Sequence, residues 1–128
     1  SAVSESGQNL TFQHEGESLT IRLAKTARAG EERTFQIDYQ GVPADGLIID
    51  NNKFGDRTIF GDNWPNRAHH WLPTVDHPSD KASVEFIVTA PNDLQVIANG
   101  IQIEETNLDN GLKITHWRET GVLPTKVM

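Results

Sequence analysis

The 128-residue sequence contains no cysteine, which excludes a disulfide framework, a thiolate metal site and a cysteine nucleophile but leaves the cellular compartment undecided. It has no apolar run near the roughly 18 residues that a membrane-spanning helix needs. It also lacks the Gly-x-Ser-x-Gly elbow, the phosphate-binding glycine loop and the His-Glu-x-x-His pair. No catalytic set can therefore be assembled from this sequence.

Positive charge is also scarce, because 11 Lys and Arg residues stand against 18 Asp and Glu residues, for a net charge of −7. Nucleic-acid binding needs a basic face that displaces counterions, so this class of partner is disfavoured. The chain length suits one domain of common size. We therefore expect residues 1–128 to form a single domain.

Both ends of the sequence look like cuts in a longer polypeptide. Residues 1–5 lack the basic and apolar regions of a signal peptide and do not begin with Met, and residues 125–128 carry no closing signal. We interpret the chain as a fragment that is truncated at both ends.

The sequence does contain many short stretches in which apolar and polar residues alternate with the period of a half-buried strand. No segment has helical periodicity over three turns. The predicted strands are residues 10–14, 19–23, 34–39, 47–49, 57–60, 83–88, 94–98, 101–103 and 112–117. Asn99-Gly100 and Asp109-Asn110-Gly111 are predicted hairpin turns, because Asn and Gly tolerate positive φ. The predicted fold is all-β, an antiparallel sandwich or saddle-like sheet.

The stretch from residue 60 to residue 91 holds two of the three tryptophans and three of the five histidines. Loops on a rigid scaffold are where binding residues concentrate, so this stretch is the candidate site. Trp71, next to Leu72, is predicted to cover the core. Trp64 lies in a polar loop, where a ligand-binding role and a core role are equally favoured.

The histidines of this stretch suggest a metal cluster made of His69, His70 and His77 with Asp76 and Asp80. Imidazole and carboxylate suit zinc. Adjacent histidines on an extended chain point to opposite sides, however, so they do not converge easily on one ion. We favour one histidine packing beside the neighbouring tryptophan and the other in solvent, and we predict no metal site in this chain.

Asp76 could take part in acid–base chemistry with His77, but Asp side chains commonly set turns by accepting hydrogen bonds from backbone N–H groups. His77 precedes a proline, which holds it extended. We predict a structural role for Asp76.

Three segments carry distinctive motifs. Residues 71–82 follow the pattern W-[FL]-P-x-x-D-x-P-x-x-K-A, residues 39–47 follow Y-x-G-x-P-x-x-G-L, and residues 97–100 end in Asn-Gly. Together these segments resemble the N-terminal domain of the aminopeptidase N family of zinc metallopeptidases. The motif residues are Trp71, Pro73, Asp76, Pro78, Lys81, Asn99 and Gly100. The three segments occur in the family's order, and the resemblance covers about residues 34–128.

The resemblance implies a saddle-shaped all-β domain that precedes a thermolysin-like catalytic domain. That catalytic domain supplies the zinc ligands and the general base, so zinc belongs to the parent enzyme and no cofactor belongs to this chain. The chain would frame the substrate groove and dock on the catalytic domain of the same polypeptide. The alternative is a stand-alone β-sandwich module that binds a peptide or a carbohydrate, and a third option is a purely structural domain.

The resemblance also implies one functional residue in this domain. Relatives carry a Glu or Gln twelve positions before the motif aspartate, and it binds the α-amine of the peptide substrate. Trp64 stands there in this sequence, and its indole N–H can donate but not accept a hydrogen bond. Its ring face could contact a cation, and Asp62 or Asn63 could supply the missing oxygen. The candidate substrate-binding residues are therefore Asp62, Asn63 and Trp64, unless this branch recognises substrates differently.

Overall fold

The computed structural model describes all 128 residues, and just under half of them lie in strands. The strands are β1 (Ala2–Glu5), β2 (Gln8–Asn9), β3 (Thr11–Glu15), β4 (Ser18–Arg22), β5 (Phe35–Asp38), β6 (Leu47–Asn51), β7 (Arg57–Gly61), β8 (Lys81–Pro91), β9 (Ile101–Asn107) and β10 (Leu112–Pro124). Two 3₁₀ segments, η1 (Ala68–His70) and η2 (Thr125–Val127), complete the chain. Neither is long or apolar enough to cross a membrane.

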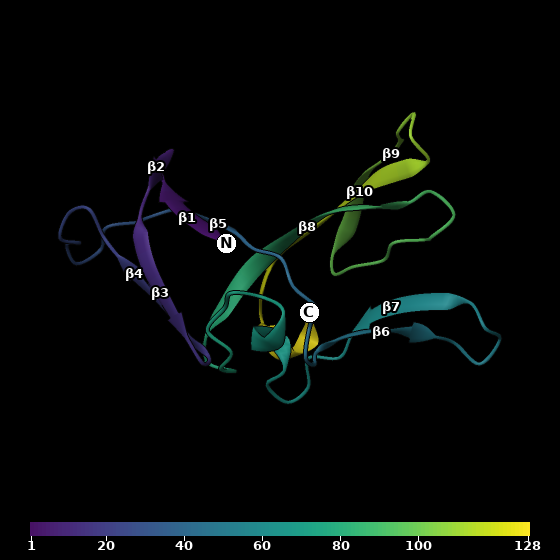
Figure 1. Ribbon diagram of the computed structural model, residues 1–128, viewed down its shortest axis with the longest axis horizontal. Coiled ribbons are helices and arrows are strands. Elements are labelled where there is room, and N and C mark those ends of the chain that lie inside the picture. Colours follow the sequence, from purple (N-terminus) through teal and green to yellow (C-terminus); the bar gives the residue numbers. More distant parts are fainter.

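The strands form four antiparallel sheets. Two have three strands, in the orders β2-β1-β5 and β8-β10-β9, and two are the hairpins β3–β4 and β6–β7. The β3–β4 hairpin lies on the left of Figure 1 and β6–β7 extends to the right, with β8 and β10 running between them. The predicted all-β antiparallel fold is confirmed, in an open, sandwich-like arrangement.

The structure contradicts one predicted hairpin. Residues 94–98 are not a strand, so Asn99-Gly100 does not join two paired strands. β9 pairs instead with β10, through the Asp109-Asn110-Gly111 turn, which is confirmed. The physical reason is that other segments hold the Asn-Gly pair: Asn99 Nδ2 donates to the carbonyl oxygen of Val127 at 2.9 Å, and Gly100 lies against the backbone of Arg118 in β10. These contacts outweigh the local turn preference of Asn-Gly.

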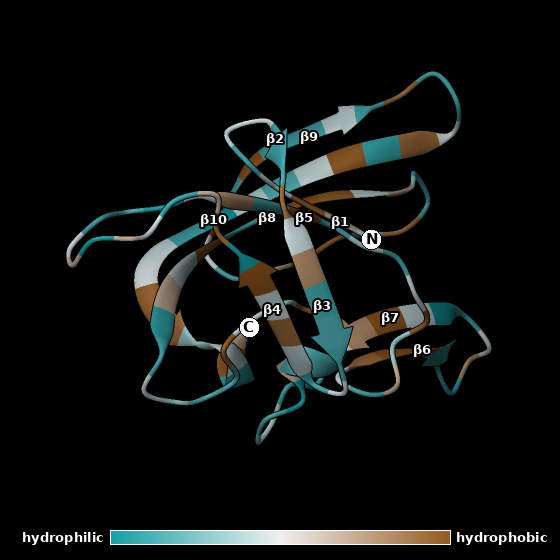
Figure 2. Ribbon diagram, turned by 60° about the vertical axis from the view of Figure 1, so that its left-hand side comes forward, coloured by the Kyte–Doolittle hydropathy of each residue, from teal (hydrophilic) through white to brown (hydrophobic).

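Very few residues are buried. The seven buried residues are Val3, Gly46, Asn63, Ala68, Lys113, Thr115 and Thr125. The chain exposes 9593 Å², whereas a compact monomer of this mass exposes about 6800 Å². Figure 2 shows that brown, apolar segments recur along β4, β6, β7 and β10 rather than gathering in one centre. The strands therefore present much of their apolar surface to the outside.

Candidate functional site

Four of the seven buried residues lie where the loop between β7 and β8 meets the turn before β6 and the end of the chain. We call residues 45–46, 62–76 and 125–128 the junction. Its buried members are Gly46, Asn63, Ala68 and Thr125. Since the junction contains the candidate substrate-binding residues, its geometry decides which side chains are free to meet a ligand.

Asn63 is at the centre of the junction, with a residue exposure of 2%. Its Nδ2 donates to the carbonyl oxygen of Met128 at 2.9 Å, and its Oδ1 accepts a hydrogen bond from Trp71 Nε1 at 2.8 Å. The Tyr39 hydroxyl donates to the carbonyl oxygen of Trp71 at 2.8 Å. Both ends of the Asn63 amide are thus engaged within the protein, and they fix Trp71 against the end of the chain.

Arg67 connects the loop to the turn before β6. Its Nη2 lies 2.5 Å from Asp62 Oδ2, its Nη1 lies 3.4 Å from Asp45 Oδ1, and its Nε donates to the carbonyl oxygen of Trp64 at 2.6 Å. The hydrogen bond from the Gly46 N–H, and after it the Arg67 charge, holds the pKa of Asp45 below its ordinary value. Two carboxylates share one guanidinium, so this cluster keeps a net negative charge.

Gly46 is essential to this arrangement. Its φ is +77°, and a Cβ at this position would lie 2.2 Å from the carbonyl oxygen of Arg67. Since real Cβ atoms do not approach an oxygen so closely, only glycine lets the two backbones pass. The glycine of the second family segment is therefore a packing requirement for the loop.

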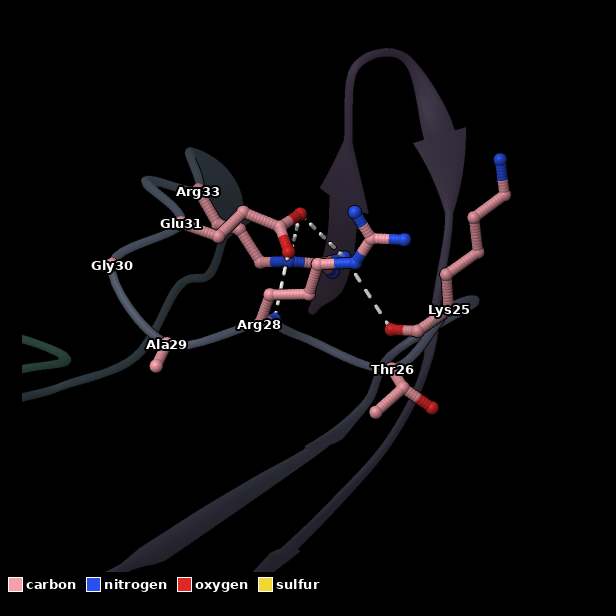
Figure 3. A pocket seen from close by; sticks show the side chains of 7 residues that line it. All are labelled: Lys25, Thr26, Arg28, Ala29, Gly30, Glu31 and Arg33. Atoms are coloured by element: carbon pink, nitrogen blue, oxygen red, sulfur yellow. Dashed lines mark hydrogen bonds and ion pairs between the residues drawn. The ribbon is translucent and has the colours of Figure 1, made fainter.

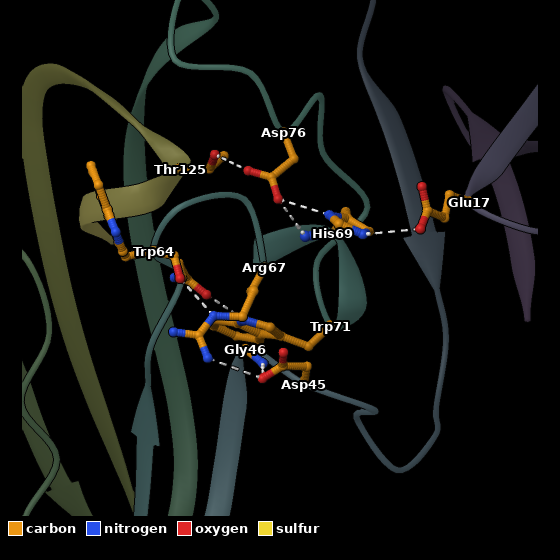
Figure 4. Close-up of polar contacts among 10 residues, drawn as sticks. Glu17, Asp45, Gly46, Trp64, Arg67, His69, Trp71, Asp76 and Thr125 are labelled. Atoms are coloured by element: carbon orange, nitrogen blue, oxygen red, sulfur yellow. Dashed lines mark hydrogen bonds and ion pairs between the residues drawn. The ribbon is translucent and has the colours of Figure 1, made fainter.

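Asp76 lies between the loop and the end of the chain (Figure 4). Its carboxylate accepts hydrogen bonds from the His69 backbone N–H at 3.2 Å, from His69 Nδ1 at 2.8 Å and from Thr125 Oγ1 at 2.5 Å. His69 Nε2 lies 3.5 Å from Glu17 Oε1, which brings the β3–β4 turn to the same point. Through these contacts, Asp76 accepts a hydrogen bond from a backbone N–H and joins the loop to the end of the chain.

The Asp76–His69 pair shifts both pKa values toward the charged forms. The hydrogen bond with Asp76 raises the pKa of His69, burial opposes the rise, and the charge of Glu17 adds to it. Burial alone would raise the pKa of Asp76, but the hydrogen bonds from Thr125 and His69 outweigh it and hold that pKa below its ordinary value. The pair therefore favours the charged form of each side chain. It joins the β7–β8 loop, the β3–β4 turn and the end of the chain, and we call it the clamp.

Trp64 has the opposite environment to Trp71. It is 60% exposed, and the Lys126 Nζ lies 4.8 Å from the centroid of its ring. The face of the indole thus already accepts an ammonium group. Arg67 bonds both the Asp62 carboxylate and the carbonyl oxygen of Trp64, so it links the aromatic face to carboxylate oxygens.

The histidines do not converge on a metal position. No group of three or more His, Asp or Glu side chains is arranged to hold an ion. The His69 and His70 rings lie 4.2 Å apart, and His77 Nδ1 bonds Ser79 Oγ at 2.7 Å within its own turn. The residues of this chain do not fit a zinc site.

The other motif residues shape the chain around the junction. Pro73 and Pro78 are exposed in the loop, and Lys81 begins β8 opposite Pro124. Asn99 Nδ2 donates to the carbonyl oxygen of Val127 at 2.9 Å. Gly100 has φ of +89°, and a Cβ there would lie 2.0 Å from the Arg118 carbonyl oxygen. Asn99-Gly100 therefore fixes the end of the chain instead of turning a hairpin.

Arg67 and Lys126 were not predicted as site residues. Arg67 is the only Lys or Arg between residues 60 and 76, a range that holds the two acidic residues Asp62 and Asp76, and this single cation could have indicated an ion pair. Nothing in the sequence around Lys126 indicates a site residue, because Lys126 and Trp64 are far apart in the sequence and meet only in the folded chain.

A second cluster of charged residues lies in the loop before β5 (Figure 3). Glu31 accepts hydrogen bonds from the Arg28 backbone N–H at 2.9 Å and from Arg33 Nε at 3.2 Å. Arg33 also pairs with Glu5 at 3.2 Å. Glu31 and Arg33 pair within the loop, and Arg33 also joins the loop to β1, so this cluster is not part of the junction.

Comparison with known proteins places this geometry in context. The chain matches the peptidase M1 N-terminal domain over residues 3–127. A search of curated proteins found no match. Among solved structures, an M1 zinc metallopeptidase from Deinococcus radiodurans superposes with a TM-score of 0.84 at 27% identity. A mutant of the same enzyme bound to a Tyr-Ser-Ala substrate gives 0.84 at 26%, and a two-domain M1 zinc metallopeptidase mutant bound to L-arginine gives 0.80 at 25%. Each alignment covers 98% of this chain and 30% of the other chain.

Proposed function

Because this chain belongs to the peptidase M1 N-terminal domain family, we propose that it forms one wall of the substrate groove in a zinc-dependent aminopeptidase. The family match over nearly the whole chain carries this proposal. The chain spans about a third of its structural neighbours, so a catalytic domain in the same polypeptide would supply the zinc and the reacting groups. The stand-alone binding module is not favoured, because the whole of this chain aligns to one part of much longer metallopeptidases.

Within that enzyme, the exposed part of the junction is proposed to bind the α-ammonium group of a peptide substrate. An ammonium has three donors and no acceptor, so it needs oxygen atoms around it. The Asp45–Arg67–Asp62 cluster keeps a net negative charge, and the face of Trp64 accepts a cation. We assign direct contact to Asp62 and Trp64.

Asn63 belongs to the same proposal in a different role. Its amide is fully engaged with Trp71 and Met128, so it would position the loop rather than touch the substrate. Anchoring the amine at the wall of the groove would limit cleavage to the N-terminal residue of a peptide.

The test uses the intact protein with free and N-acetylated peptides. Loss of a charge-assisted contact costs about 1.5–3 kcal/mol. Asp62→Asn should therefore lower kcat/KM for free peptides by about 10- to 100-fold. Asp45→Asn is the matched comparison, because it removes the same charge from the Arg67 cluster but not the oxygen atoms assigned to the substrate, and it should lower kcat/KM by less than Asp62→Asn does.

The outcomes distinguish failure of the proposed enzyme from failure of the Asp62 assignment. An intact protein that binds no zinc and cleaves no peptide would contradict the proposed enzyme. Normal activity of Asp62→Asn would contradict only the assignment of Asp62. If Asn63→Ala loses discrimination between free and acetylated peptides while Asp62→Asn keeps it, Asn63 is the anchor.

A further inference from the structure

The β6–β7 hairpin, which leads directly into the candidate site, has apolar side chains on both faces. Ile48 lies opposite Phe60, and the next pair along the strands is Ile49 opposite Ile59. Successive residues of a strand point to opposite faces, so one pair lies on each side of the hairpin. An antiparallel sheet with one face in water normally has polar residues on that face. This pattern is typical of strands that are covered on both sides.

No other strand covers this hairpin in the structure. β6 and β7 form a two-stranded sheet of their own. Ile49 is 45% exposed, Ile59 49% and Phe60 51%. A two-stranded hairpin is at best marginally stable in water without further packing. In Figure 1 it extends from the body of the molecule on the side opposite to β3–β4.

The tip of the hairpin is closed by hydrogen bonds and presents an aromatic residue. Asn52 Oδ1 accepts hydrogen bonds from the backbone N–H groups of Phe54 at 2.8 Å and of Asp56 at 3.0 Å. The Phe54 side chain is 77% exposed, with Lys53 Nζ 4.9 Å from its ring centroid. An ordered tip that presents a large apolar side chain loses little conformational entropy on binding.

Three observations indicate that the cover is a domain of the same polypeptide. The exposed area exceeds that of a compact monomer by far more than the roughly 800 Å² per partner of a standard interface. The structural neighbours are more than three times as long as this chain. The carbonyl oxygen of Met128 accepts a hydrogen bond from Asn63, just after β7, so residue 128 lies beside the base of the hairpin.

We propose that the β6–β7 hairpin is a docking element that inserts, tip first, into an apolar groove on the catalytic domain of the parent polypeptide. The identity of that domain rests on the proposed function. Docking would cover both apolar faces of the hairpin. It would also hold the Asp62–Trp64 loop at the edge of the catalytic domain.

The first test is hydrogen exchange of residues 47–61 in the intact protein. The double variant Ile49→Thr with Ile59→Thr keeps β-branched side chains, which preserves the hairpin itself, but removes apolar contact. We expect exchange of the hairpin amides to become about tenfold faster or more. The control is Ile87→Thr with Ile101→Thr, two isoleucines of β8 and β9 that are each 67% exposed, and it should leave hairpin exchange unchanged.

The second test places a photo-reactive benzoylphenylalanine at position 54 of the intact protein. Cross-links from the tip to residues beyond 128 of the same chain are expected. Cross-links only within residues 1–128, or to a second copy of the chain, would overturn the proposal, as would unchanged exchange in the hairpin variant. Peptidase activity is measured separately, so inactivity with correct cross-links would count against the proposed function alone.

Discussion

The junction and the β6–β7 hairpin are neighbours in the sequence but are stabilised in different ways. In the junction, buried polar side chains bond one another and the backbone, as Asn63 and Asp76 show. In the hairpin, backbone pairing holds the strands while isoleucines stay half exposed. The polar groups of the junction find their partners within this chain, whereas the apolar side chains of the hairpin stay half exposed. A region that is fixed by its own contacts can therefore lie directly beside one whose apolar surface its own chain leaves open.

Among the variants that test this comparison, Asp76→Ala should lower the free energy of unfolding the most. Asp76→Ala would remove the three hydrogen bonds that the carboxylate accepts from His69 and Thr125. Since the carboxylate is partly buried and each such bond contributes about 1–1.5 kcal/mol, the loss costs about 3–5 kcal/mol. The free energy of unfolding, measured by hydrogen exchange of β10 in the intact protein, should fall by about that amount. Asp80→Ala, four residues away, should change it by about 0.5 kcal/mol or less. Equal effects of the two variants would show that the junction is not locked by Asp76.

Gly46→Ala should cause the next largest loss of stability. Gly46 and Gly111 have φ of +77° and +76°, but only Gly46 has a backbone oxygen within reach of an added Cβ. Both Gly46→Ala and Gly111→Ala carry the cost of positive φ, about 1–2 kcal/mol. Crowding against Arg67 should add about 1–3 kcal/mol to the first variant alone. Equal melting temperatures of the two variants would contradict the close approach of the turn and the loop.

The clamp between His69 and Asp76 predicts a smaller effect that depends on pH. The pKa of His69 is raised in the folded state, so its contribution to stability is complete below about pH 6.5 and is lost as pH rises through the folded value. The pKa of Asp76 is lowered, so its contribution is present above about pH 3.9 and is lost as pH falls through its folded value. The stabilisation is therefore greatest between these limits.

The measurement is the difference in free energy of unfolding between wild type and His69→Gln across that range. This difference should shrink as pH rises from about 6 to about 8. His77→Gln is the control, since His77 bonds only Ser79 and its backbone, and it should give a difference that stays constant. If the difference between wild type and His69→Gln grew as pH rises, the clamp would not be the source of this stability, because its contribution falls with rising pH.

Lys126 gives the smallest expected effect, on binding rather than stability. Its ammonium covers the face of Trp64 that the proposed function gives to the substrate. An exposed cation–π contact is worth about 0.5–1 kcal/mol, so Lys126→Met should lower KM for free peptides about two- to fivefold with kcat unchanged. Lys53→Met removes the equivalent contact with Phe54 at the hairpin tip and should leave KM unchanged. A higher KM for Lys126→Met would mean that Lys126 positions Trp64 instead of competing with the substrate.

The sequence was sufficient for the all-β class, for most strand positions and for the family. The alternation along β4, β5 and β8 and the Asp-Asn-Gly turn are local signals, since side-chain direction and turn conformation depend on neighbouring residues. Asn99-Gly100 misled for the same reason. Its local preference is for a hairpin, but its contacts with Val127 and with the backbone of Arg118 hold it in another conformation.

The candidate site could be located from the sequence but not assigned in detail. The stretch from residue 60 to residue 91, which is rich in tryptophan and histidine and carries the first motif, contains most of the junction. Nothing in the sequence showed that Asn63 is buried between Trp71 and Met128, that Arg67 bridges Asp45 and Asp62, or that Lys126 lies on Trp64. These contacts join residues from 5 to 65 positions apart. The sequence by itself thus determined which elements form, because each depends on short-range geometry. Only the tertiary structure decided which polar groups are satisfied and which apolar faces stay open, because both depend on where distant segments meet.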